Sequence, residues 1–149
     1  MVVEQSGATL YLLDFGDYIK LGYSNSFKKR IYDIGRKSEK EIDFESSLYW
    51  KVSMSVGLAL ESSLLTKYDE HVIRGHKLSK KEVLSPVVKD DIRRDIEEFT
   101  KLFELVIVER PLSDLLIGIY DKKPGAHDDD RFLLFYTKFW KRRNLEIQN

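Results

Sequence analysis

Apolar residues gather in three short stretches in the first third of the chain, and in two of these stretches they alternate with polar residues. An apolar run that begins at Thr9 ends in turn residues 14–17, and residues 18–23 then alternate between apolar and polar positions. Two such runs joined by a short turn predict a β-hairpin from about Leu10 to Gly22. Residues 48–52 alternate in the same way and predict a third strand. We therefore expect a small antiparallel three-stranded sheet.

Outside these strands the apolar period changes to the three- and four-residue spacing of helices. This spacing predicts helices near residues 26–36, 57–72 and 87–103. Ser24 or Asn25 is a candidate cap for the first of them. Helices that flank a small antiparallel sheet define an α+β domain.

A further strand is expected after the third helix. Residues 105–108 form an apolar run between two glutamates, and Pro111 is expected to end it. The apolar residues 112–120 do not distinguish helix from strand. Their Gly-Ile-Tyr tripeptide at 118–120 receives no functional weight, because no capped basic helix follows it at a usable spacing.

The end of the sequence predicts an amphipathic helix. Three aspartates at 128–130 precede aromatic residues at helical spacing, and bases follow at 141–143. His127 and these aspartates resemble a metal cluster, but a solvated turn is the expected interpretation. We expect a domain over residues 1–104 and a C-terminal strand and helix extension over 105–149 that packs on it or contacts nucleic acid.

Composition limits the class of protein. At 149 residues and 42% hydrophobic content, the chain can bury one sizeable core. It contains no cysteine, which excludes disulfides, thiolate-bound zinc and a cysteine nucleophile. No apolar run reaches the length of a membrane span, and the pattern of a signal peptide is missing. We therefore expect a cytoplasmic protein with no membrane partner.

The charge balance weighs mildly against a protein that coats DNA. Lysine plus arginine equals aspartate plus glutamate at 25 each, so the whole molecule attracts no polyanion. The charges are nevertheless segregated along the chain, because bases gather at 28–40 and acids at 90–98. A local basic face is still expected.

Glu61 is a candidate functional residue because of its place in the second predicted helix. An angular count from Leu58 puts Leu65, Tyr68 and Val72 on one apolar stripe, with Glu61 in its middle. A carboxylate there is costly to bury unless a cation, a metal ion or an open cleft compensates it. The alternative is a partly exposed glutamate paired with a lysine or arginine.

Three short motifs follow one another along the predicted hairpin and the first helix. Thr9-Leu10-Tyr11 lies on the first strand, Lys20-Leu21-Gly22 on the second, and Arg30 follows on the first helix. Together with Ala59-Leu60-Glu61 they resemble the GIY-YIG nuclease family, in particular its phage-type branch, whose second motif reads Lys-hydrophobic-Gly. The resemblance covers roughly residues 9 to 100.

This resemblance implies a metal-dependent DNA endonuclease. Glu61 would hold a single Mg²⁺ (or Mn²⁺), Arg30 would bind the scissile phosphate, and Tyr11 would orient or deprotonate the attacking water. Lys20 or the metal would make the phenol of Tyr11 more acidic.

The three side chains Tyr11, Arg30 and Glu61 are expected to meet across one cleft. The reason is that Glu61 should face the same apolar layer that Phe27 and Ile31 cover.

Contacts with DNA are expected at the motif and at the last helix. Gly22 would allow close approach of backbone or phosphate. Aromatic residues beside arginines suit nucleic acid, although aromatic positions at helical spacing are more often core. The candidate basic contacts are Lys28, Lys29, Lys141, Arg142 and Arg143.

Some positions depart from the family pattern. The family often has a histidine or tyrosine where this chain has Ile34, and Tyr18, Tyr23 or Tyr32 are candidates to replace it in space. Glu82 stands where the phage-type branch has a Glu-Trp-Phe-like tripeptide, either as a surface charge or in support of the site. The alternative function is a catalytically inactive GIY-YIG-like module that binds nucleic acid or protein.

Overall fold

The protein has an α+β fold, as predicted. The computed structural model describes residues 7–119 and 130–148. In that part of the chain a five-stranded antiparallel sheet has the order β4-β2-β1-β3-β5. The strands are β1 (Ala8–Asp14), β2 (Ile19–Ser24), β3 (Leu48–Val52), β4 (Val83–Leu84) and β5 (Glu109–Pro111).

The predicted hairpin and third strand are confirmed, but the three-stranded sheet is extended by an edge strand on each side. β4 has two residues and β5 has three, which is too short for alternation to be visible in the sequence. The strand expected at 105–108 is wrong. The strand lies at Glu109–Pro111 instead, and Pro111 is its last residue, as an edge strand tolerates a residue without an N–H.

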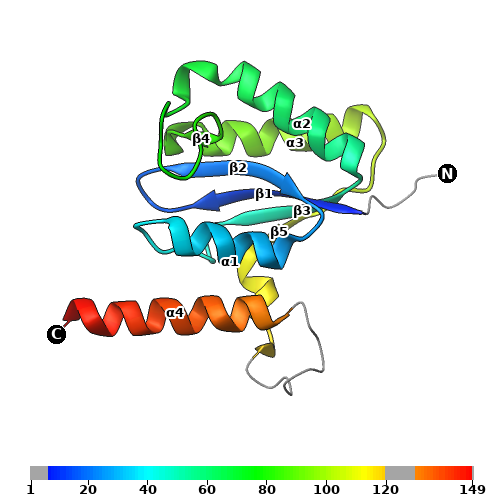
Figure 1. Cartoon of the computed structure of the whole chain (residues 1–149). Coiled ribbons are helices and arrows are strands. Elements are labelled where there is room, and N and C mark those ends of the chain that lie inside the picture. The colour runs from blue at the N-terminus through cyan, green and yellow to red at the C-terminus, as the bar shows by residue number, and fades with distance from the viewer. Residues whose placement is uncertain (1–6, 120–129, 149) are drawn as a thin grey trace.

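Helices lie on both sides of the sheet, as Figure 1 shows. α2 and α3 cover one face, α1 covers the other, and α4 lies beyond α1. The α-helices are α1 (Phe27–Lys37), α2 (Met54–Lys67), α3 (Lys89–Leu102) and α4 (Asp130–Gln148), and short 3-10 helices are η1 (Asp69–His71), η2 (Pro86–Val88) and η3 (Leu112–Leu116).

The start of α1 differs in detail from the prediction. Ser26, not Ser24 or Asn25, is the N-cap residue, and its side chain makes no capping hydrogen bond. Ser24 instead accepts a hydrogen bond from the Ser26 N–H at 2.9 Å. The turn into α1 is therefore held by the serine that ends β2.

The sheet separates two hydrophobic clusters. Successive side chains of a strand point to opposite faces, so Leu10 and Leu12 pack towards α2 and α3, whereas Tyr11 and Leu13 pack towards α1. On β2 the same alternation puts Lys20 on the α1 side of the sheet, between two residues of the other cluster.

α4 packs closely against α1, which supports the core interpretation of its aromatic residues. Tyr136 and Trp140 are buried there. The Ile42 N–H donates to Tyr136 Oη at 2.8 Å, and Trp140 Nε1 donates to the Gly35 carbonyl at 3.3 Å. A Cβ at Gly35 would lie 2.0 Å from a ring carbon of Tyr136. Glycine is therefore required for the two helices to approach this closely.

The apolar stripe predicted from α2 onwards is confirmed only in part. Tyr68 is buried and Leu65 and Val72 pack against the core, but Leu58 is 51% exposed. The helix itself buries Gly57, Leu60 and Leu64. The helix also ends at Lys67, before the predicted end at 72. Glu61 consequently lies beside the buried stripe, half-buried, instead of in its middle.

Within the part of the chain that the structure describes, no helix combines the length and the hydrophobicity needed to cross a membrane.

Candidate functional site

The open edge of β2 carries the candidate site. β4 pairs only with Ile19 and Lys20, so the rest of this edge has no neighbouring strand. The Leu21 N–H donates to the Glu82 carbonyl at 3.1 Å. The backbone N–H of Tyr23 lies close enough to the Glu61 carboxylate to lower its pKa, so Glu61 of α2 is near this strand edge.

Tyr11 and Gly22 form one structural unit. They are direct partners in the antiparallel register of β1 and β2. A Cβ at Gly22 would lie 2.4 Å from Tyr11 Oη, so the tyrosine ring occupies the space above the glycine. The other side of the ring stacks on Phe27 of α1, with 5.4 Å between centroids. The space at Gly22, expected to admit backbone or phosphate, is therefore filled by Tyr11.

Lys20 lies beside this tyrosine as a buried cation, only 4% exposed. Its Nζ is 2.8 Å from Glu82 Oε2 and 5.4 Å from the centroid of the Tyr11 ring. Of the two interpretations of Glu82, the geometry therefore favours support of the site over a surface charge.

The acidity of Tyr11 is opposite to the expectation. Burial raises the pKa of the phenol above its ordinary value, and the positive charges of Lys20 and Arg30 offset only part of that rise. The expected acidification by Lys20 is present but smaller than the desolvation. Glu82 also neutralises much of the Lys20 charge and itself raises the pKa of Tyr11. Tyr11 is therefore a protonated phenol at neutral pH.

Glu61 has the most perturbed carboxylate of the site. Burial, together with the negative charge of Glu82, raises the pKa of Glu61 to about 7, while Lys20 and the Tyr23 N–H act in the opposite direction. Lys20 lowers the pKa of Glu61 only by its charge, because its ammonium group donates its hydrogen bond to Glu82. The charge of Glu61 is therefore incompletely compensated.

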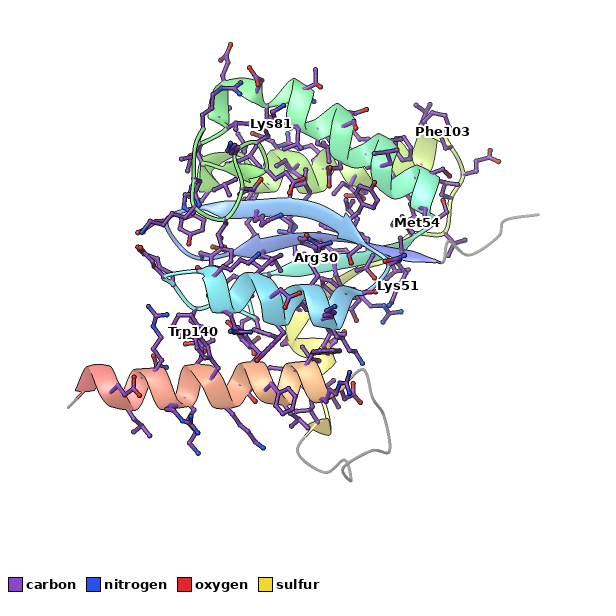
Figure 2. All side chains as sticks on the ribbon, in the orientation of Figure 1. Arg30, Lys51, Met54, Lys81, Phe103 and Trp140 are labelled. Carbon is purple, nitrogen blue, oxygen red and sulfur yellow. The ribbon has the colours of Figure 1, made fainter. Side chains whose placement is uncertain are left out.

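Arg30 is exposed on α1, where that helix meets the sheet (Figure 2). It lies close enough to Tyr11 to lower the pKa of the phenol. Arg30 therefore acts on Tyr11, whereas Lys20 acts on both Tyr11 and Glu61. Of the neighbouring bases, Lys28 pairs with Asp130 of α4 and Lys29 is exposed.

The helices that carry Arg30 and Glu61 are placed differently from the prediction. Phe27 and Ile31 of α1 cover one face of the sheet, whereas α2 with Glu61 packs on the other face. The expectation that Glu61 faces the layer covered by Phe27 and Ile31 is therefore wrong. Arg30 and Glu61 approach the site from opposite faces, around the uncovered edge of β2.

Ile34, which stands where GIY-YIG nucleases often have a histidine or tyrosine, has apolar surroundings in the structure. Ile34 is buried between α1 and its neighbours. Of the candidates to replace it, Tyr18 shares a hydrogen bond with Ser38, and Tyr32 packs on aromatic rings of α4. Tyr23 contributes to the site through its backbone N–H.

The donor set at the site fits one hard divalent cation. No group of three or more histidine, cysteine or acidic side chains is arranged for a metal among the described residues. Mg²⁺, however, is often held by one or two carboxylates while it keeps several waters. The charge of the Glu61 carboxylate is only partly balanced by nearby positive charge, and Glu82 lies close enough to raise the pKa of Glu61. The alternative cluster at His127 and two of its aspartates, 128 and 129, lies outside the described residues, as does position 120 of the Gly-Ile-Tyr tripeptide.

Comparisons with known protein families, with curated proteins and with solved structures find no match to this chain. The resemblance to GIY-YIG nucleases therefore depends on the motif residues and their arrangement.

Proposed function

We propose that the protein is a metal-dependent DNA endonuclease of the GIY-YIG type. The observation that carries this proposal is the half-buried carboxylate of Glu61, which lies near the edge of β2 with its charge incompletely compensated. Such a group costs folding free energy, so a site that retains it has a use for a cation. Its neighbours supply a phenol, a buried lysine and an exposed arginine.

Each of these residues has a distinct task in the hydrolysis of a phosphodiester. Glu61, with Glu82 beside it, would hold one Mg²⁺ or Mn²⁺. The ion, when bound, would neutralise charge on the phosphate and make a water more acidic. Arg30 is exposed and donates in a planar fork, which suits two oxygens of the scissile phosphate.

Tyr11 would orient the attacking water instead of deprotonating it. Its pKa is raised by burial, so the phenol keeps its proton at neutral pH. Its ring is fixed between Gly22 and Phe27, which gives the hydroxyl one position. Lys20 would assist as a buried positive charge beside that hydroxyl, itself placed by Glu82.

A second candidate is the inactive module that binds nucleic acid or protein without cleavage. The observation that favours it is the burial of Tyr11, which is only 2% exposed. A water-orienting hydroxyl must be reachable by solvent in the substrate complex, so this candidate requires that the ring stays covered when DNA binds.

Nicking of supercoiled plasmid in the presence of Mg²⁺ or Mn²⁺ tests the proposal. We expect nicking by the wild type and a loss of about 10²–10³-fold in rate for Glu61→Gln and for Arg30→Ala, as when one charge-stabilising group is removed. Glu70→Gln and Arg94→Ala are matched controls on exposed sites and should nick like the wild type. A wild type that does not nick would support the inactive module. Equal nicking by all five proteins would show that cleavage does not depend on Glu61 or Arg30 and would refute the proposed site.

A further inference from the structure

The layer formed by α1 and α4 is strongly basic although the chain is neutral. α1 contains five bases and one acid, and α4 contains five bases and two acids. These two helices thus carry ten of the 25 bases but only three of the 25 acids. The remainder of the chain must be acidic by the same amount. The charges are separated by layer, because α1 and α4 lie together on one side of the sheet (Figure 1).

The positive charges of this layer are available to a partner. Among the described residues of α1 and α4, one base, Lys28, forms an ion pair, and its partner is Asp130. The exposed bases of α1 begin with Arg30 at the candidate site and include Lys29, Arg36 and Lys37. A basic surface therefore runs from the candidate site across α1 towards α4.

Arginines along the junction of the two helices cover aromatic rings. The guanidinium carbon of Arg36 lies 5.4 Å from the centroid of the Tyr32 ring, and that of Arg143 lies 4.8 Å from a ring centroid of Trp140. Tyr32 in turn packs against Phe135 of α4. Such contacts hold the guanidinium groups in place and occupy the ring faces that unstacked bases would need. The surface thus presents fixed charges, which suit a phosphate backbone.

We propose that the face formed by α1 and α4 is the surface on which duplex DNA lies, with its backbone running from Arg30 across α1 to the rim of α4. The inference rests on the proposed function in that the polyanion is placed at the nuclease site. Charge complementarity argues for a polyanion, and the covered rings argue for a duplex over a single strand. α4 then extends the nuclease domain as its DNA-holding arm.

The helical period identifies which bases of α4 belong to this face. Arg142 follows Phe135 by seven residues and Phe139 by three, so it shares their side of the helix, next to Tyr32. Lys141 instead follows Thr137 by four residues and shares the other flank. Of these two exposed bases, Arg142 remains a DNA contact in this proposal, whereas Lys141, a candidate contact from the sequence, is assigned to the flank that faces away from DNA.

Binding of a fluorescent DNA duplex by the full chain, followed by anisotropy over a salt series in EDTA, tests the inference. Arg36→Gln and Arg142→Gln should each bind more weakly and lower the slope of log K against log salt by about 0.9, as when one phosphate contact is lost. Lys141→Gln and Arg94→Gln remove the same charge elsewhere and should leave the slope within error of the wild type. Melting curves check that each variant is folded.

Four results would overturn the inference. They are an unchanged slope in Arg36→Gln and Arg142→Gln, an equal loss in Lys141→Gln or Arg94→Gln, tighter binding of a single strand than of the duplex, and binding of anionic lipid vesicles with no binding of DNA. The assay contains no divalent ion, so it is independent of cleavage. Binding as inferred without any nicking would refute only the proposed function, whereas nicking with no effect of these two variants would refute only the inferred surface.

Discussion

Tyr11 and Gly22 act as a pair in this protein, because the side chain of one fills the space that the other leaves. The distance of 2.4 Å from a Gly22 Cβ to Tyr11 Oη is far below contact distance, and the neighbour is a ring held by Phe27. A glycine in a strand commonly marks a close approach of another group. Here that group is the phenol at the candidate site.

Gly22→Ala should therefore displace the Tyr11 ring. We expect a loss of about 1–3 kcal/mol in the free energy of unfolding, as for other overpacked sites, and loss of nicking. Denaturant unfolding measures the first effect. In a Tyr11→Ala background the same change should cost much less, because the clashing ring is gone. Equal costs in both backgrounds would contradict the pairing.

Glu61 links stability to pH. Its folded pKa of about 7 is above the ordinary value of 4.5, so the folded protein binds a proton that the unfolded chain releases. The contribution of Glu61 to the free energy of unfolding is therefore most favourable below about pH 4.5, and it is lost as the pH rises through 7. Each pKa unit corresponds to about 1.4 kcal/mol, which gives a cost of up to about 3 kcal/mol.

Glu61→Gln should remove this cost. Without divalent ions we expect the variant to be more stable than the wild type at pH 8 by up to about 3 kcal/mol, and to differ little at pH 5. Melting curves at both pH values measure the difference. Addition of Mg²⁺ should raise the melting temperature of the wild type and leave the variant unchanged.

The control for this experiment is Glu70→Gln, an exposed glutamate in η1, which should change neither the pH dependence nor the response to Mg²⁺. Strong destabilisation by Glu61→Gln at pH 8 would instead identify Glu61 as half of a structural ion pair.

At the scale of elements, the contact of α1 with α4 depends on the absence of a side chain at Gly35. Gly35→Ala would favour the helical conformation of α1 by about 1 kcal/mol, yet its Cβ would lie 2.0 Å from the Tyr136 ring. We expect the clash to outweigh the propensity, with a net loss of about 1–2 kcal/mol. Denaturant unfolding measures the loss, and the fluorescence of the buried Trp140 should respond. Lys37→Ala, an exposed change in α1, should leave both unchanged.

Elements with a strong local signal could be predicted from the sequence, and those set by distant partners could not. The hairpin that pairs Tyr11 with Gly22 is local, so its motif and its geometry agree. β4 is defined only by its pairing with β2, and the Lys20–Glu82 ion pair joins residues 62 positions apart, so no periodicity reveals either. The stripe of α2 was misplaced because several apolar residues, such as Leu58, remain exposed. The raised pKa of Tyr11 follows from burial that depends on the whole fold.

At the scale of the whole molecule, the separation of charge makes the neutral protein a dipole. The layer of α1 and α4 is positive, and the rest of the chain is negative by the same amount. At low ionic strength we expect the basic layer of one copy to associate with the acidic surface of another, because screening is then weak and charges attract over a longer distance. Sedimentation should show concentration-dependent association that disappears in about 0.15 M salt, where the screening length is about 8 Å.

Addition of a short duplex at low salt should also dissociate these assemblies, because DNA competes for the basic layer. A protein that sediments as a monomer at every salt concentration would show that the charge separation is too weak to drive association.

The contact between α1 and α4 also has a consequence for the order of folding. One hydrogen bond joins α4 to α1 across 105 positions, and another joins α4 to Ile42 after α1 across 94 positions, so the entropy cost of closing these loops is large. The hairpin, by contrast, closes over a few residues and can form early. During synthesis the hairpin of the candidate site would thus form while the surface of α1 that α4 covers is still exposed. The proposed DNA-binding face would be complete only after α4 has left the ribosome, so a nascent chain would carry the candidate site without that face.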